Sequence, residues 1–298
     1  MTDTTATTMP FADDPARVRA ERGGRGRLAG FLARRAAYGV LLLYCAIVMV
    51  PLVWVVVASL KTRREVFLEP FGLPAEAQWN NYSNIFESGF QSYIWNSVVV
   101  TVGAVVPMVI VSIMAAYALA RRVFLARRTI YMLIVLTYAI PVHSILIPLY
   151  RMVDDMGLLN TYLGLILPHI ALGIPFSVVI LYSFFLDFPG ELEEAARVDG
   201  CSPWRILFAI VLPLSAPAVL SVVIFQTVSV WNEFLWASIA ASGEEVRVWT
   251  TGIMQFQGQY SSDWPKILAV VNLMTLPLLL IYILAQRHFV RAFAGIGK

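Results

Sequence analysis

The sequence predicts an all-α, polytopic membrane protein with six transmembrane helices. Its 298 residues are 59% hydrophobic and only 14% charged, whereas a soluble domain carries about 25% charged residues. The apolar residues come in long blocks, and about 20 apolar residues in a helix cross the core of a bilayer. An open sheet could not satisfy its backbone hydrogen bonds in lipid, so these blocks favour helices.

Six apolar blocks account for the six predicted spans. They cover residues 38–60, 98–120, 130–150, 162–186, 218–240 and 267–285. Prolines lie inside several blocks, including Pro51, Pro141 and Pro175. Interior prolines are tolerated in membrane helices where neighbouring groups or water satisfy the carbonyls that they free. Each block is therefore expected to cross the membrane as one helix.

The placement of basic residues predicts the orientation of these helices. Of the 22 Lys and Arg residues, sixteen fall on the side of the two termini and six on the opposite side. Because cytoplasmic segments of membrane proteins are enriched in Lys and Arg, both termini are expected in the cytoplasm. The net charge of +3 is too small to indicate a nucleic-acid partner.

Three parts are expected along the chain. Residues 1–33 are rich in Thr, Asp, Ala and Arg and are predicted to be a disordered cytoplasmic tail. Residues 34–290 form the six-helix membrane domain, and residues 291–298 form a cytoplasmic C-terminal tail. The first apolar block is too long for the apolar region of a signal peptide, so a membrane span is favoured there.

A polar loop between the fourth and fifth blocks, residues 187–213, differs from the other connections. The pattern predicts two short helices around a turn. The first helix has an acidic beginning, which the helix dipole favours; its acidic residues are Glu191, Glu193 and Glu194. Gly200 can adopt the left-handed conformation that ends a helix. Ser202 followed by Pro203 is typical of the N-cap and first residue of the next helix.

One face of the first predicted helix carries small residues at its centre. This face comprises Leu192, Ala195, Ala196 and Asp199, which recur at helical spacing. Small side chains would let another protein surface approach closely, so the face could dock into a groove on a soluble partner. The alternative is an amphipathic loop that lies on the bilayer. The acidic first helix argues against that alternative, because membrane-surface helices are usually basic.

The same loop resembles the characteristic loop of permeases in binding-protein-dependent ABC importers. Its pattern is Glu-Ala-Ala, three residues, Gly, nine residues, Ile, one residue and Leu-Pro. The chain matches it at Glu194-Ala195-Ala196, Gly200, Ile210 and Leu212-Pro213. Further stretches are similar to the sugar branch and its smaller maltose-type permease: Asn81-Tyr82, Asn96-Ser97, Ala115–Arg121, Pro148–Tyr150, Gly157–Thr161, Pro175-Phe176, Trp231–Phe234 and Gln286-Arg287.

This resemblance implies a type I ABC-importer permease fold and a non-catalytic transport subunit in a bacterial cell membrane. The implied partners are a second, larger permease, two ATPase subunits that bind ATP and Mg, and an extracytoplasmic sugar-binding protein. The loop would be the coupling helix that sits in a cleft of the ATPase. Its implied coupling residues are Glu194, Ala195, Ala196, Asp199, Gly200, Ile210, Leu212 and Pro213.

No catalytic, metal or cofactor site is expected in this chain itself. The sequence contains no phosphate-binding loop of the Gly-x-x-x-x-Gly-Lys-Ser/Thr type. Its three histidines, His143, His169 and His288, are scattered without metal-ligand spacing. His143 and His169 fall inside apolar blocks, where a polar role in the pore and a buried hydrogen bond both remain open.

A candidate substrate path runs along the fifth block. Glu233 interrupts an apolar stretch, and a carboxylate at mid-membrane costs about 2.5–3.5 kcal/mol, so it is expected to face a cavity or a partner. A sugar path needs hydrogen-bond acceptors and aromatic surfaces, which Trp231, Glu233 and Trp236 would supply; Gln226, Asn232 and Asn272 are further candidates.

The alternative for Glu233 is a purely structural role, in which it pairs with the sister permease or extends to the outer membrane interface. At the level of function, the alternative is a secondary transporter acting alone. In that case Glu233 would be its one serious candidate for ion coupling, and the polar loop would have no evident purpose. A third alternative, a membrane enzyme, is not supported, because the sequence shows no recognisable set of catalytic residues.

Overall fold

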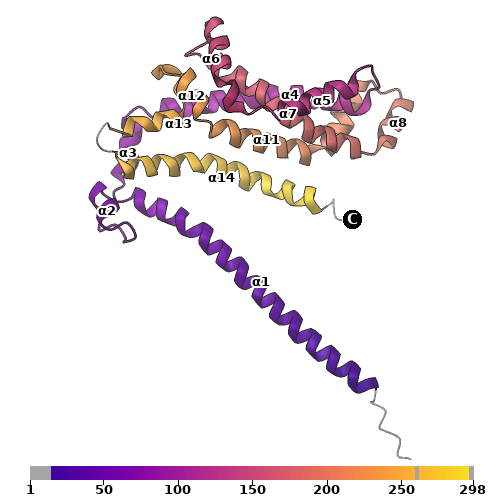
Figure 1. The fold of residues 1–298 in the computed structure, drawn as a ribbon, viewed down its shortest axis with the longest axis horizontal. Coiled ribbons are helices and arrows are strands. Elements are labelled where there is room, and N and C mark those ends of the chain that lie inside the picture. The colour runs from indigo at the N-terminus through magenta and orange to yellow at the C-terminus, as the bar shows by residue number, and fades with distance from the viewer. Residues whose placement is uncertain (1–14, 259–261, 295–298) are drawn as a thin grey trace, which may run out of the picture. The chain divides into compact units, whose positions relative to one another are not determined.

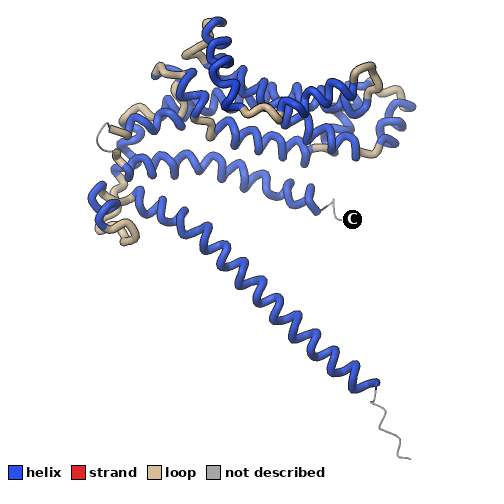
Figure 2. Tube along the Cα trace, in the orientation of Figure 1, coloured by secondary structure: helices blue, strands red, loops and turns tan. Residues whose placement is uncertain are grey.

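The fold is helical throughout the described part of the computed structural model, residues 15–258 and 262–294. Within that part, the one pairing of extended backbone is an isolated bridge between Gln257 and Ser262. Figure 2 shows the helices joined by short loops. The predicted all-α class is therefore confirmed for the described residues. The chain divides into two compact units, Met1–Val57 and Ala58–Lys298.

The first unit contains most of helix α1 (Pro15–Ser59). Its part Arg34–Ser59 is long and apolar enough to cross a membrane, which agrees with the first predicted span. The helix begins earlier than predicted, so residues 15–33 are helical rather than disordered, and residues 1–14 lie outside the described chain. Ala and Arg, which favour helices, are abundant there, but four glycines, which disfavour them, occur in the same stretch.

The second unit holds the remaining helices, with short ones at both ends of a set of long ones (Figure 1). In chain order they are α2 (Arg63–Leu68), α3 (Asn80–Glu87), α4 (Gln91–Arg121), α5 (Arg127–Thr137), η1 (Val142–Ile145), α6 (Leu146–Asp155), α7 (Tyr162–Asp187), α8 (Gly190–Val198), α9 (Pro203–Ile206), η2 (Leu207–Val211), α10 (Leu212–Leu214), α11 (Ala216–Trp231), α12 (Leu235–Ala240), η3 (Glu244–Val246), α13 (Trp249–Gly252), η4 (Ile253–Phe256) and α14 (Trp264–Ala294). Helix α8 lies at the opposite end of this unit from α3, α12 and α13 (Figure 1).

Helices α4 and α7 form the centre of the core and pack closely. Two glycines make this approach possible. A Cβ on Gly103 would lie 2.8 Å from Ile166 Cδ1, and a Cβ on Gly173 would lie 2.4 Å from Met108 Cε. Small residues that let backbones approach are the usual means of packing membrane helices. Helix α11 then packs against α4, α7 and α14.

Two of the six predicted spans are broken. Helix α5 ends at Thr137 and meets the following η1–α6 segment at 90°. Pro141 lies at this break and cannot donate a backbone hydrogen bond. The helical stretch 203–214 meets α11 at 77°, and α11 stops at Trp231, before the end of the predicted fifth block. By length and composition, the described residues contain four unbroken candidate spans, or six if each bent pair is one span.

The C-terminal boundary also differs from the prediction. Helix α14 continues to Ala294, so residues 291–294 belong to a helix that begins in the membrane domain. Residues 295–298 lie outside the described chain. No helix end marks residue 290 as the border of a tail.

Candidate functional site

The polar loop folds as the two short helices that the sequence predicts. Helix α8 ends in a Schellman motif, in which Cys201 N donates to Ala196 O at 2.9 Å and Gly200 N donates to Arg197 O at 3.0 Å. Gly200 has φ +78°, the left-handed conformation expected of it. This turn fixes where the chain leaves α8 and enters α9.

The start of α9 also agrees with the prediction. Ser202 is its N-cap, and its Oγ accepts a hydrogen bond from Arg205 N at 3.3 Å. Pro203 occupies the first helical position. Further on, the backbone widens into the π-helical segment η2, where Leu212 N donates to Leu207 O. Pro213 has no N–H to offer to the preceding turn, which favours this local widening.

The faces of α8 differ from the prediction at one residue. Ala195, Glu194 and Asp199 are exposed, as a docking surface requires. Ala196, by contrast, is 7% exposed and packs into the core of the protein itself. The buried side of α8 consists of Glu193 and Ala196, which are three residues apart and so lie on one face of the helix. Ala196 cannot belong to the outward-facing surface.

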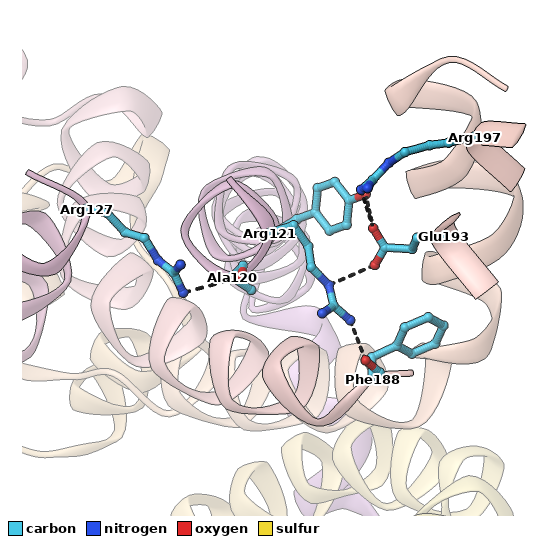
Figure 3. Close-up of polar contacts among 7 residues, drawn as sticks. Ala120, Arg121, Arg127, Phe188, Glu193 and Arg197 are labelled. Carbon is cyan, nitrogen blue, oxygen red and sulfur yellow. Dashed lines mark hydrogen bonds and ion pairs between the residues drawn. The ribbon is translucent and has the colours of Figure 1, made fainter. Parts of the chain in front are cut away.

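Glu193 is the centre of an ion-pair cluster that the sequence analysis missed (Figure 3). Arg121 Nε lies 2.8 Å from Glu193 Oε1, and the Tyr117 hydroxyl donates to Glu193 Oε2 at 2.9 Å. Arg197 Nη2 approaches the same Oε2 at 3.4 Å. The Glu193 carboxylate is nearly inaccessible, with a side-chain exposure of 2%. One buried anion thus meets two cations and a hydroxyl.

This cluster fastens α8 to the end of α4. Tyr117 and Arg121 are one turn apart on α4, and Arg121 also donates to the carbonyl of Phe188, just before α8 (Figure 3). Removing one member of a buried pair leaves an uncompensated charge and costs about 3–5 kcal/mol. The spacing of Tyr117 and Arg121 at a span end, beside an acidic loop, was the available sequence signal.

A cavity of about 420 Å³ lies within the second unit. Its walls come from α5, η1, α6, α7, α11 and α12. It is lined by Tyr138, Val142, His143, Leu146, Leu149, Pro168, His169, Leu172, Gly173, Phe176, Phe225, Gln226, Ser229, Val230, Glu233, Leu235 and Trp236. Its size falls within the roughly 300–1,000 Å³ of small-molecule sites.

Three of the six predicted path residues, Gln226, Glu233 and Trp236, line this cavity, and three do not. The Trp231 indole is buried and donates to Met274 O at 3.1 Å. The Asn232 amide bends back to Val228 O at 2.9 Å. The remaining residue, Asn272, donates to Ser59 Oγ at 3.0 Å and Tyr82 Oη at 3.1 Å. These three side chains serve packing and local hydrogen bonds.

Glu233 lies in the turn between α11 and α12 rather than inside a continuous fifth helix. Its Oε1 accepts from Trp236 N at 2.7 Å, and its Oε2 accepts from Ala237 N at 3.0 Å. Unpaired N–H groups at the start of a helix favour such a carboxylate. Both oxygens are held by the backbone, and the same side chain forms part of the cavity wall.

Both histidines in question line the cavity as well. His169 on α7 is half-buried, and His143 in η1 is exposed. Within the described chain, no group of three or more His, Cys, Asp or Glu residues is placed to hold a metal ion. The lining also includes Ser229 and the aromatic residues Tyr138, Phe176 and Phe225, which the sequence analysis did not select.

Comparison with known proteins identifies the family of the chain. The binding-protein-dependent transport system inner membrane components match residues 108–295. The chain belongs to this family. An ABC transporter permease of a Caldicellulosiruptor species is 39% identical over 84% of this chain and 91% of its own length. The diacetylchitobiose uptake system permease of Streptomyces coelicolor is 35% identical over 85% and 84%.

A solved structure shares the fold. It is a bacterial ABC transporter involved in the import of the acidic polysaccharide alginate, and it matches with a TM-score of 0.72 and 21% identity over 94% of this chain and 100% of the matched chain. The type I ABC-importer permease fold predicted from the loop is therefore confirmed. The chain is a multi-pass inner-membrane component of an ABC transporter.

Proposed function

We propose that this chain is the smaller permease of an ATP-driven sugar importer. It pairs with a second, larger permease, two ATPase subunits that bind ATP and Mg, and an extracytoplasmic sugar-binding protein. The chain itself is non-catalytic, and both of its termini face the cytoplasm. The observation that carries this proposal is the α8–α9 loop, in which Glu194, Ala195 and Asp199 are exposed on a helix that is fastened to the core.

The loop has the mechanical properties that coupling requires. An ATPase subunit that grips the exposed face of α8 would also move the end of α4, because Glu193 and Arg121 join the two helices. Helix α4 packs against α7 and α11, which line the cavity. Motion at α8 would thereby change the walls of the substrate path. The half-buried Ile210 and Leu212 anchor the second half of the loop in the core.

The sugar assignment rests on the cavity and on the relatives. The cavity combines hydrogen-bonding side chains, Gln226 and Glu233, with aromatic faces, which suits polyhydroxylated molecules. The Streptomyces coelicolor relative, 35% identical to this chain, is the permease of a diacetylchitobiose uptake system, which supports a carbohydrate substrate. Alternating access would expose the cavity first to the outside and then to the cytoplasm.

A purification through a tag on this chain tests the proposal. The chain, co-expressed with its genomic neighbours, should bring down two ATPase subunits and a second permease. The ATPase activity of this complex should rise when a sugar-loaded binding protein is added. A preparation without any ATPase, combined with uptake by this chain alone, would contradict the proposal and favour a secondary transporter.

A further inference from the structure

The described side chains that line the cavity include an acidic residue but neither Lys nor Arg. Its lining contains a single carboxylate, that of Glu233, and two imidazoles, those of His143 and His169. Among the described residues that line it, none is Lys or Arg. An anion that enters the cavity therefore meets a fixed negative group and no permanently cationic side chain.

The polar groups on α11 form a row of hydrogen-bond acceptors. Ser229 follows Gln226 by three residues and Glu233 follows it by seven. Gln226 and Ser229 therefore share one face of α11, and Glu233 continues this row just beyond the end of the helix. The amide nitrogen of Gln226 is engaged, because it donates to Gly173 O at 2.9 Å and to Ser177 Oγ at 3.0 Å. Of the described residues, none donates to the Gln226 Oε1. This face offers oxygens to a ligand that carries hydroxyl donors.

An aromatic row lies across the same cavity. The rings of Tyr138 and Phe176 are 6.2 Å apart, and those of Phe176 and Phe225 are 5.8 Å apart, measured between centroids. Tyr138 directly follows α5, and Phe176 and Phe225 belong to α7 and α11. Aromatic faces pack against the apolar C–H surface of a ring, so the cavity presents both chemistries of a sugar, its hydroxyls and its C–H face.

We propose that this cavity selects uncharged, hydroxyl-rich sugars and rejects sugars that carry a phosphate, sulfonate or carboxylate. Moving an anion out of water costs several kcal/mol unless a cation compensates for it, and the described residues of this chain that line the cavity include no Lys or Arg. Glu233 adds like-charge repulsion, and it cannot easily turn away because two backbone amides hold it. This inference rests on the proposed import function and names its class of substrate.

The preference of the cavity for cations over anions can be tested before the transported sugar is identified. In the assembled complex in nanodiscs, Cys45 and Cys201 are replaced by Ser and Ser229→Cys is introduced. The rates of modification by a trimethylammonium-ethyl and by a sulfonato-ethyl methanethiosulfonate are then compared. Ser92→Cys, at an exposed position at the start of α4, supplies the reference ratio.

The cavity should favour the cationic reagent about tenfold over the reference ratio, because opposite charges attract and like charges repel in a partly desolvated site. Adding Glu233→Gln, which keeps one oxygen for the α12 amides, should bring the ratio close to the reference. Equal ratios at positions 229 and 92, or no reaction with either reagent at position 229, would overturn the proposal.

The substrate itself gives a second readout. A panel of neutral probes (maltose, cellobiose and diacetylchitobiose) and anionic probes (an aldobiouronic acid and glycerol 3-phosphate) is added to the wild-type complex, and slowing of Ser229→Cys modification is measured. Neutral probes should slow the reaction more than anionic ones at equal concentration. Stronger protection by an anionic probe, or equal protection by both classes, would refute the selection. Failure of the proposed function would be separate, since it would appear as a complex without ATPase subunits.

Discussion

Glu193 and Glu233 lie in two regions of one membrane domain and are held in opposite ways. Glu193, on the loop side, is buried and meets Arg121 and Arg197. Glu233, on the cavity side, is held by the backbone amides of α12 and borders open space. Because cations balance the charge of Glu193 inside the protein, this side chain can hold α8 rigidly against α4 and transmit motion between the two helices. A carboxylate fixed in place without a cation can still act on a ligand.

The largest effect is expected from breaking the ion pair between Glu193 on α8 and Arg121 on α4, called the α4–α8 joint below. Arg121→Met leaves the buried Glu193 carboxylate with the Tyr117 hydroxyl and, as its remaining cation, the exposed Arg197, which should cost about 3–5 kcal/mol and abolish ATPase association. The double variant Arg121→Met with Glu193→Leu removes both charges and should recover much of the thermal stability. Thermal unfolding and co-purification of the ATPase measure both. A double variant as damaged as the single one would contradict the joint.

The turn after α8 should give the next largest effect. Gly200→Val places a β-branched residue at φ +78°, which costs about 1–2 kcal/mol and tilts the loop. Sugar uptake should fall several-fold, together with coupled ATPase activity. Gly190→Ala, at the start of the same helix with open space around the glycine, is the matched control and should behave as wild type. Unchanged uptake and ATPase association in Gly200→Val would disprove the role of the loop.

On the cavity side, Gly173→Ala should act through packing. The added Cβ would meet Met108 Cε at 2.4 Å and Gln226 Oε1 at 3.1 Å. Overpacking of this kind costs about 1–3 kcal/mol, and here it also narrows the cavity. We expect reduced sugar uptake while the ATPase remains bound. This result would distinguish the role of the cavity from that of the Glu193–Arg121 contact. Loss of ATPase binding in this variant would show that the two regions are not separable.

The smallest effect concerns a third carboxylate, on the surface. The backbone N–H of Thr62, then that of Ala75 and the Thr62 hydroxyl, lower the pKa of Glu65 below its usual value. Because the pKa is lower in the folded state, this contribution is present above about pH 4.3, the unfolded value, and is lost as the pH falls through the folded pKa. The protection factors of the α2 amides, which are corrected for the intrinsic pH dependence of hydrogen exchange, should therefore fall as the solution is acidified below about pH 4.3. Glu65→Gln should remove this pH dependence, and an unchanged profile would contradict the assignment.

The sequence predicted well what depends on neighbouring residues. Gly200, Ser202 and Pro203 carry their conformational preferences with them, so the turn and both helix ends followed from spacing alone. The predicted place of Ala196 on the outward face was wrong, and the contacts of Glu193 were missed, because both depend on how α8 packs on α4, which no local pattern encodes. The break after Trp231 was missed for a similar reason, since Glu233 stabilises the start of α12 through contacts that form only once the chain has turned.

Two adjacent alanines allow a direct measurement of whether the exposed side of α8 contacts an ATPase. With Cys45 and Cys201 replaced by Ser, Ala195→Cys or Ala196→Cys is labelled with a photo-crosslinking maleimide in the assembled complex. Ala195 is exposed and Ala196 is buried against the core. We expect a crosslink to the ATPase subunit from position 195 that changes when ATP is added, and little or none from position 196. No ATPase crosslink from position 195 would show that the exposed side of α8 does not contact the ATPase.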